Sequence, residues 1–527
     1  MITGKNILFL CKESFSFPIY FAAELFNKSE NNVGALFVNP IESYYNKSEF
    51  NGNTYYKFKE QLPDIKLYGL EELCKQFNVA SSQPMDDYSY LNYIENKYTF
   101  YKNLNMQLIS SQLASRQYHT RFYFKRAKYS QGDKYLELGY KRVIEIVDEF
   151  KPDMILDLDD SELIRTIVNE VAHERHIPYI NINYPRYEDY KIPTYCMGLK
   201  VDSYFKKEYF KFYAKNTKEL VNEYSYVRKY RSQNKIMSQE FRGTITNQYT
   251  PNSLYKVAKY LFSKGIYFWR HSIISGNFKK AKNNILYDNS FLHFLFYCLV
   301  EIKKQYLYRK NIYFCLPKED DLYIYMPLHL IPESTTLVKA PFYINELSII
   351  EQVSKSLTIG WKLYVKEHQS MLGERDFKFY KRIHAFPNVR LVQFNYYDDP
   401  KPWIINSIGV ITITGTSAYE AAMLGKSAIV FGDVPFMLID GIIKVNSYEE
   451  LPSLLKAFTK QDNIHSCAAY IAAVQSNGII LNIKKLMSEG ESILKGEKNI
   501  SSNYLKRIKE LCEFYEKAYN EYKYNQG

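Results

Sequence analysis

The sequence has few cysteines, and none of them stands in a motif. Its seven cysteines are scattered along 527 residues, and no two are spaced as Cys-x-x-Cys. An odd number without paired spacing argues against a disulfide framework and against a structural zinc site. The same pattern is typical of a reducing compartment, so we expect a cytoplasmic protein.

Long hydrophobic runs are also missing. The longest, at 291–300, falls well short of the roughly 20 apolar residues that cross a bilayer. The short apolar run that ends at Cys11 is followed at once by Lys12 and Glu13, which does not match a secretory signal peptide. We therefore expect this first run to form a buried strand.

The chain is long and rich in aromatic residues. A chain of 527 residues exceeds what one hydrophobic core holds, so two or three domains are expected. The hydrophobic share of 46% and the charged share of 24% are ordinary for a globular protein. The 51 Tyr and 33 Phe indicate either a biased genome or rings that stack on sugars. Composition alone does not separate these two explanations.

Positive charge is concentrated in one segment. The formal net charge is +12, and residues 254–310 hold eleven Lys and Arg against two acidic residues, an excess of nine. Aromatic residues are interleaved with these basic ones. Such a segment suits contact with an anionic membrane surface or an anionic acceptor. The alternative is a helical insertion with a solvated basic face. Nucleic acid is not expected as a partner, because no nucleic-acid-binding motif accompanies the charge.

Two parts of the chain alternate apolar runs with amphipathic stretches. In residues 1–200 this rhythm predicts a doubly wound parallel sheet, with strands at 6–11, 34–39, 154–158 and 177–182. In residues 311–490 it predicts a second sheet, with strands at 321–326, 361–366, 389–393, 408–414 and 427–431. Residues 201–310 between them have helical periodicity, and 491–527 contain a charged helix. The expected fold is α/β, with two Rossmann-like domains and a mostly helical basic insertion.

The segment 408–432 carries the most chemical information. A β-branched strand ends at Thr414, Gly415 allows a tight turn, and a helix starts at Thr416 and Ser417. Hydroxyls and free backbone N–H groups at a helix N-terminus form a phosphate site, and ligands bind beyond the carboxyl ends of parallel strands. The alternative is structural, because Ser417 and Glu420 have the spacing of a capping box.

Two further segments follow predicted strands of the same sheet. Lys366 and His368 lie two residues apart at a strand end, so they share one face and suit a nucleotide phosphate. His329, Glu333 and Ser334 follow the first strand of the second domain, in a loop that we expect to face the interdomain cleft. The alternative for this loop is a proline-shaped turn that Glu333 and Ser334 cap.

These segments, in this order, resemble the capsular polysaccharide biosynthesis family of glycosyltransferases, which includes bacterial Kdo transferases. The resemblance covers residues 322–436 and rests on Pro-Leu-His-x-x-Pro-Glu-Ser-Thr, Val-Lys-Glu-His and Thr-Gly-Thr-Ser-Ala-Tyr-Glu-Ala. It implies the two-domain GT-B fold, a nucleotide-sugar donor with a CMP-sugar favoured, and a polysaccharide or lipid-linked acceptor. It also implies phosphate contacts from His368, Thr416 and Ser417.

The chain departs from that family in one motif. The family continues Lys-Glu-His with proline, whereas Gln369 stands here, which leaves the turn after His368 less stiff. In the first domain the chain resembles the family only in its general alternation of strands and helices, and no motif matches. There Ile177–Arg186 resembles the last strand of the family's N-terminal domain, which would bring Arg186 to the cleft.

The expected chemistry is transfer of a sugar without a cofactor or a metal ion. No Asp-x-Asp motif stands where a metal-dependent transferase needs it. The proton of the acceptor hydroxyl requires a base, and the candidates are Glu13, Asp159 and Asp160, although the aspartates also suit helix caps. Three other functions remain open, namely a nucleotide-sugar 2-epimerase, a CDP-polyol phosphotransferase and a non-enzymatic capsule-assembly scaffold. Contact with the inner face of the plasma membrane is a further expectation.

Overall fold

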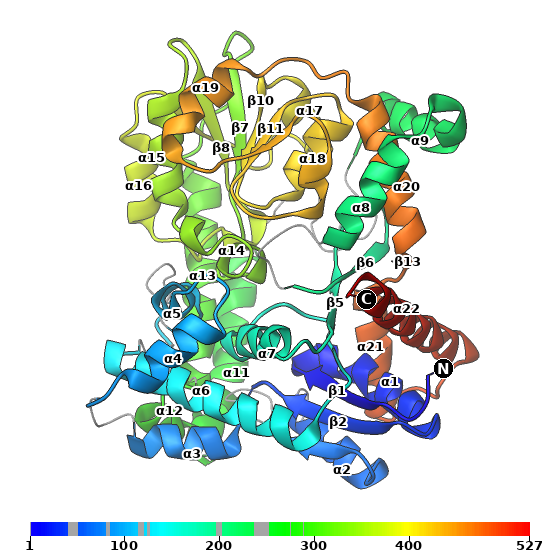
Figure 1. Ribbon diagram of the computed structural model, residues 1–527. Coiled ribbons are helices and arrows are strands. Elements are labelled where there is room, and N and C mark those ends of the chain that lie inside the picture. The colour runs from blue at the N-terminus through cyan, green and yellow to red at the C-terminus, as the bar shows by residue number, and fades with distance from the viewer. Residues whose placement is uncertain are drawn as a thin grey trace.

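The protein folds around two β-sheets, one in each half of the view in Figure 1. This is a computed structural model, and it describes residues 2–39, 51–80, 85–113, 121–123, 127–196, 203–236, 252–274, 276–287 and 289–526. Both sheets are dominated by parallel strands with helices on both faces. The expected fold class, two Rossmann-like α/β domains, is confirmed.

The first sheet has seven strands. In spatial order they are β13 (Ile479–Ile480), β6 (Tyr190–Thr194), β5 (Tyr179–Asn183), β4 (Met154–Leu156), β1 (Asn6–Cys11), β2 (Asn32–Phe37) and β3 (Lys66–Tyr68). The pairs from β5 to β3 are parallel, while β6 pairs antiparallel with both β5 and β13. Strand β1, between β4 and β2 inside the sheet, is buried from Ile7 onwards, as a parallel strand covered on both faces must be.

The second sheet has six strands, and all its pairs are parallel. In spatial order they are β12 (Ile442–Lys444), β11 (Ala428–Val430), β10 (Gly409–Thr412), β7 (Tyr323–Pro327), β8 (Lys362–Lys366) and β9 (Val389–Val392). Because the strands are parallel, their carboxyl ends meet at one edge of the sheet. That edge faces the first sheet and carries the segments that the sequence singles out.

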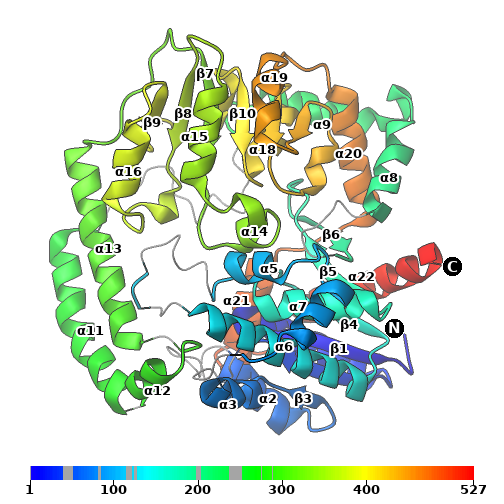
Figure 2. The same ribbon diagram turned by 60° about the vertical axis from the view of Figure 1, so that its left-hand side comes forward.

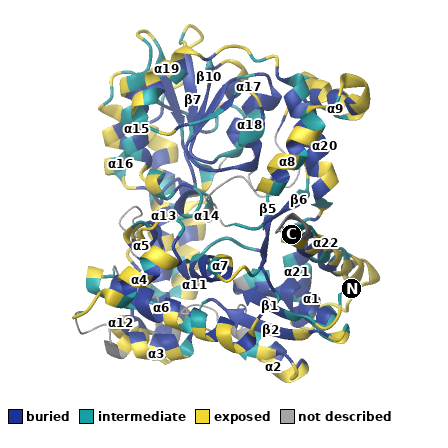
Figure 3. Ribbon diagram, viewed as in Figure 1, coloured by how far each residue is buried: buried dark blue, intermediate teal, exposed yellow. Residues whose placement is uncertain are grey.

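Helices of the first half cover both faces of the first sheet. They are α1 (Ser16–Lys28), α2 (Asn51–Gln61), α3 (Glu71–Ala80), α4 (Ser89–Lys97), α5 (Leu104–Ser110), α6 (Tyr129–Phe150) and α7 (Leu163–Glu174). One face packs against α1, and the other packs against α6 and α7. Figure 3 shows both sheets as buried and the outer helix surfaces as exposed.

Helices of the second half surround the second sheet in the same way. They are α14 (Ser334–Leu337), α15 (Glu346–Ser356), α16 (Phe377–His384), α17 (Lys401–Ile405), α18 (Thr416–Met423), α19 (Leu451–Lys456) and α20 (Ile464–Asn477). One apolar core contains α15, α16 and α19 residues, and the other contains α18 and α20 residues.

The helices within 201–310 form two groups. The first group, α8 (Ser203–Tyr213) and α9 (Val221–Ser232), packs against α20 and contributes to the core around α18. The second group is α11 (Leu254–Ile274), α12 (Asn277–Asn283) and α13 (Ser290–Lys310). Its helices α11 and α13 run side by side along one edge of the molecule (Figure 2).

The chain returns to the first sheet after it has completed the second. Strand β13 joins the edge of the first sheet, and α21 (Ile483–Leu494) and α22 (Ser502–Gln526) pack against α1. Tyr504, Ile508 and Leu511 of α22 are fully buried there. The first sheet is therefore assembled from both ends of the sequence.

Candidate functional site

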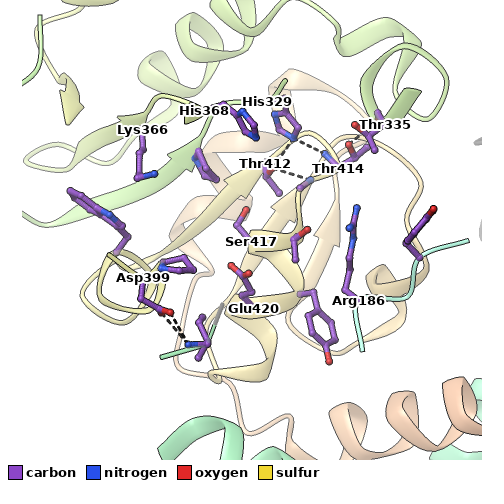
Figure 4. Close-up of a pocket in the computed structure, with 18 of the residues that line it drawn as sticks. Arg186, His329, Thr335, Lys366, His368, Asp399, Thr412, Thr414, Ser417 and Glu420 are labelled. Atoms are coloured by element: carbon purple, nitrogen blue, oxygen red, sulfur yellow. Dashed lines mark hydrogen bonds between the residues drawn. The ribbon is translucent and has the colours of Figure 1, made fainter. Parts of the chain in front are cut away.

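A cavity of about 830 Å³ lies between the two sheets. Its walls come from the carboxyl ends of β7, β8 and β10, from the segment around β6 and from the end of α9. Figure 4 shows side chains from these elements converging on it. Of the residues that the sequence singles out, ten line this cavity: Arg186, His329, Glu333, Lys366, His368, Thr414, Gly415, Thr416, Ser417 and Glu420.

The turn between β10 and α18 forms the centre of the site. Thr412, at the end of β10, accepts a hydrogen bond on Oγ1 from the Gly415 N–H at 3.1 Å. An added Cβ at Gly415 would lie 2.3 Å from that oxygen and 3.3 Å from Nε2 of His329. Such separations are too short for a side chain, so glycine is required at this position by close packing.

The capping box that was the structural alternative at Ser417 and Glu420 is not formed, so that alternative is wrong. The N-cap residue of α18 is Gly415, and no side chain caps the helix. Ser417 lies inside the first turn, and its Oγ is buried without a hydrogen-bond partner in the protein. The first backbone N–H groups of a helix have no partners within the helix. This end of α18 therefore presents donors suited to an anion.

Lys366 and His368 both line the cavity at the end of β8, as the alternation of the strand predicts. Burial lowers the pKa of Lys366 to about 8, although the negative charges of Glu367 and Glu420 act to raise it. Burial, with the positive charges nearby, lowers the pKa of His368 to about 4. Lys366 is therefore the cation of this wall at neutral pH, and His368 is a neutral ring.

The position of the proton on the neutral His368 ring follows from its neighbours. Nδ1 of His368 accepts a hydrogen bond from the Ser370 N–H at 3.2 Å. The neutral ring therefore holds its proton on Nε2. Although Gln369 replaces the proline of the family motif, the next turn is ordered as a 3-10 helix that His368 itself caps.

Glu367, between these two residues, binds a buried arginine. Nε of Arg375 donates to Glu367 Oε1 at 3.1 Å, and the hydroxyl of Tyr380 donates to Oε2 at 2.8 Å. Arg375 also pairs with Glu346 at 2.6 Å and donates to the carbonyl of His329 at 2.8 Å. This network fixes the loops after β7 and β8 relative to each other.

The loop after β7 has one buried and one exposed part. The backbone N–H of His329 donates to Glu346 Oε1 at 2.6 Å, which holds the histidine against the β10 turn. Glu333 is exposed and accepts a hydrogen bond from the Thr335 hydroxyl at 2.7 Å. Thr414 donates its own hydroxyl to the Thr335 carbonyl at 2.8 Å. Ser334 begins α14, and its side chain lies outside the described residues.

Arg186 and Glu420 line the cavity from two different elements, the segment before β6 and helix α18. Nε of Arg186 is buried without a hydrogen-bond partner, and its guanidinium lies 5.8 Å from the centre of the Tyr184 ring. Glu420 follows Ser417 by one helical turn and so shares its face of α18. Burial and the charge of Asp399 raise the pKa of Glu420 to about 7, while Arg186 and Lys366 act in the opposite direction.

Two of the carboxylates expected as the catalytic base, Asp159 and Asp160, are described and do not line this cavity. Asp159 pairs with Arg165 at 2.9 Å, and Asp160 pairs with Lys339 at 3.1 Å. They do not cap the next helix either, because the N-cap residue of α7 is Glu162, without a side-chain cap. The side chain of Glu13 lies outside the described residues.

Several cavity residues were not expected from the sequence. Asp399 accepts hydrogen bonds from the Ile236 N–H at 3.1 and 3.0 Å, which ties the chain after α9 to this wall. The rings of Tyr325 and Trp403 are stacked at 6.0 Å beside it. Asp399 could have been found from the sequence, because residues 393–400 follow β9 and therefore lie at the same carboxyl edge of the sheet as the other motifs. Among the described residues no group of three or more His, Cys, Asp or Glu is placed to hold a metal ion.

No family model and no curated protein matches the sequence. Solved structures with similarity include KpsC, the beta Kdo 2,7 transferase of Thermosulfurimonas dismutans. It is 9% identical, with 68% of this chain and 90% of that chain covered and a TM-score of 0.28. The UDP-N-acetylglucosamine 2-epimerase from Rickettsia bellii is 12% identical, with 93% of this chain and 96% of that chain covered and a TM-score of 0.26. The wall teichoic acid polymerase TagF is 16% identical, with 37% of this chain and 48% of that chain covered and a TM-score of 0.21.

Proposed function

We propose that this protein is a cytoplasmic glycosyltransferase that takes a sugar from a nucleotide-sugar donor without a metal ion. One observation carries the proposal. The buried hydroxyl of Ser417 lacks a protein partner at the start of α18, in a cavity that Lys366 and Arg186 also line. A helix N-terminus with a free hydroxyl and two cations is a site for a phosphate group. The motifs shared with capsular polysaccharide transferases favour a sugar nucleotide as its source.

The donor side of the reaction follows from these groups. When the bond between the sugar and the phosphate breaks, negative charge develops on the leaving phosphate oxygen. The N–H groups of α18, the Ser417 hydroxyl and protonated Lys366 stabilise that charge in place of a metal ion. Nε2 of His368 donates a further hydrogen bond. Glu420, on the same face of α18, is suited to accept hydrogen bonds from hydroxyls of the nucleotide.

The acceptor side requires a carboxylate that removes a proton from the attacking hydroxyl. Glu188 and Asp189 line the cavity just before β6. Asp159 and Asp160 become available only if their ion pairs with Arg165 and Lys339 open. Glu188→Gln, Asp189→Asn and Asp160→Asn variants test these roles. Loss of the base lowers kcat and leaves KM for the donor unchanged.

Thermal-shift measurements with CMP, CDP, UDP and GDP test the nucleotide site. Stabilisation by CMP supports a donor like a CMP-sugar, which we favour, and stabilisation by CDP favours a CDP-polyol phosphotransferase. A flat response to all four nucleotides contradicts the phosphate site and favours a scaffold. His368→Ala is expected to abolish transfer and to keep the fold, with a slightly lower unfolding temperature because the Ser370 N–H loses its cap. Wild-type turnover by that variant overturns the phosphate contact of His368.

The raised pKa of Glu420 favours a second candidate, a nucleotide-sugar 2-epimerase. A carboxyl group with a pKa of about 7 exchanges protons readily at neutral pH. Inversion at C2 breaks a C–H bond, so an epimerase in deuterated water incorporates deuterium into its sugar nucleotide without any acceptor. Mass spectrometry of UDP-N-acetylglucosamine after incubation distinguishes the two. Deuterium uptake contradicts a transferase, and its absence together with transfer to an acceptor contradicts an epimerase.

A further inference from the structure

Helix α11 has two apolar stripes, and only one of them is buried. The buried stripe contains Val257 and Phe268, which recur with helical spacing and pack toward α13. The second stripe lies on a different face and consists of Tyr255, Phe262, Ile266, Trp269 and Ile273. The exposed fractions of these side chains are 76, 84, 61, 54 and 54%. A surface helix normally turns only one stripe into the core and keeps the rest polar.

The two-stripe helix lies at the edge of the molecule on a fixed support. Among described elements, α11 packs against α12 and α13 (Figure 2). Helix α13 is tied to the second domain, since the rings of Tyr306 and Phe377 lie 5.4 Å apart. The linker before α13 is tied to the first domain, since Ile285 is buried in the core around α6. The outward stripe is therefore held in place from both halves of the protein.

Basic side chains flank the outward stripe. Lys259 and Arg270 are exposed, and each lies three residues from a member of the stripe, namely Phe262 and Ile273. Exposed Lys279 of α12 continues the basic surface beyond the end of α11. Acidic residues are nearly absent, with two against eleven basic residues over 254–310. The charge of this surface is complementary to an anionic partner.

We infer that the outward face of α11 binds the surface of an anionic lipid bilayer. The stripe sits at the level of the headgroups and the first acyl carbons, with Trp269 and Tyr255 at the boundary. Lys259 and Arg270 extend toward the lipid phosphates. No described helix is long and apolar enough to cross the bilayer, so α11 lies along its surface. An apolar stripe beside basic residues favours lipid over a dissolved polyanion, which offers no apolar phase.

Flotation with lipid vesicles tests this inference on the full chain. The protein is expected to float with vesicles of equal parts phosphatidylcholine and phosphatidylglycerol, and not with phosphatidylcholine alone. Replacing Phe262 and Ile266 by serine lowers the vesicle partition coefficient more than about tenfold, because two apolar side chains no longer leave water. The matched control replaces Phe342 and Ile359, which are 64 and 98% exposed elsewhere, and keeps wild-type flotation.

A charge-reversal pair tests the electrostatic part. Lys259→Glu with Arg270→Glu lowers partitioning more than about tenfold. The same change at exposed Lys381 and Arg382 of α16 alters the net charge equally and keeps most of the binding. Fluorescence of Trp269 is expected to shift to shorter wavelength with the mixed vesicles. Trp269→Phe removes that shift but keeps flotation. All these side chains are exposed, so the unfolding temperature is expected to stay at the wild-type value.

Three outcomes overturn the inference. In the first, the wild type does not float with either vesicle, or the Phe262 and Ile266 double variant floats as well as the wild type. In the second, only the charge-reversal variant loses vesicle binding and the wild type binds heparin as well, which indicates that the partner is a dissolved polyanion. In the third, sedimentation shows a dimer that the double variant breaks, without vesicle binding, which indicates that a second copy covers the stripe. A nucleotide site that fails its own thermal-shift test leaves these results unaffected.

Discussion

The hydroxyl of Thr412 lies 3.1 Å from Nε2 of His329, where the ends of β10 and β7 meet beneath the candidate phosphate site. The same hydroxyl oxygen accepts the Gly415 N–H. Thr412 thus holds the turn by accepting the N–H of the N-cap residue, Gly415. In many other helices a side chain within the first turn makes this hydrogen bond. The Ser417 hydroxyl, in the first turn of α18, has no hydrogen-bond partner in the protein and is available for a ligand.

Thr412→Val is expected to destabilise the fold and weaken nucleotide binding together. The variant keeps the shape but leaves the Gly415 N–H without its acceptor, which costs about 1–3 kcal/mol of unfolding free energy. Urea unfolding measures the loss, and nucleotide titration measures the affinity. Thr358→Val is the matched control, because the buried Thr358 Oγ1 has no partner and its loss is expected to be neutral. Equal stability of the Thr412 variant and the wild type contradicts this role.

Ser417→Ala is expected to separate binding from stability. Its Oγ makes no hydrogen bond within the protein, so removing it leaves the free energy of unfolding unchanged or slightly higher. A hydrogen bond to a charged phosphate contributes about 1.5–3 kcal/mol, so nucleotide affinity falls roughly tenfold or more. Calorimetric titration checks the affinity. A stability loss like that of Thr412→Val, with affinity intact, shows that Ser417 is structural.

Nucleotide affinity is expected to depend on pH through Lys366. Burial lowers the pKa of this amine to about 8, so it is charged below that value and neutral above it. Affinity for the phosphate therefore falls as pH rises through about 8. Lys366→Arg keeps its charge throughout this range and removes the fall, while Lys366→Met gives weak binding at every pH. An unchanged pH profile in Lys366→Met assigns the titration to another group.

Arg375→Met is expected to destabilise the second domain strongly. The arginine side chain is 6% exposed and neutralises the buried carboxylates of Glu346 and Glu367. Leaving these carboxylates unpaired costs about 3–5 kcal/mol. Chemical denaturation measures the loss, and exposed Arg382→Met on the neighbouring helix is the control, expected within about 0.5 kcal/mol of wild type. Similar stability of the two variants rules out this role for the network.

Regular strands and the turn between β10 and α18 could be predicted from the sequence because their signals are local. The strand expected at 408–414 is observed as Gly409–Thr412, and the helix expected from Thr416 begins there. Short apolar runs between polar ends identify buried parallel strands without knowledge of their neighbours. The rule that ligands bind at the carboxyl edge of such strands then placed Lys366 and His368 correctly on one cavity.

Features that depend on distant residues could not be predicted. Asp159 has the sequence of a helix cap, but Arg165 and Lys12 bind its carboxylate instead. Strand β13 has only two residues, and it forms because β6, far away in the sequence, offers an open edge. The capping-box spacing at Ser417 was misleading, because α18 already begins at Thr416 with Gly415 as its N-cap residue, which places Ser417 inside the first turn.

The return of α21 and α22 to the first sheet has a consequence for biosynthesis. On the ribosome the strands β1 and β2 emerge first, with the apolar side of α1 that carries Phe17 and Phe21. Those rings stay uncovered until α22 has been translated, because Tyr504 and its neighbours form their cover. The core of the first domain is therefore completed only at the end of synthesis, although its first strands are made early. Until then the apolar side of α1 is exposed on the nascent chain, where chaperones can bind it.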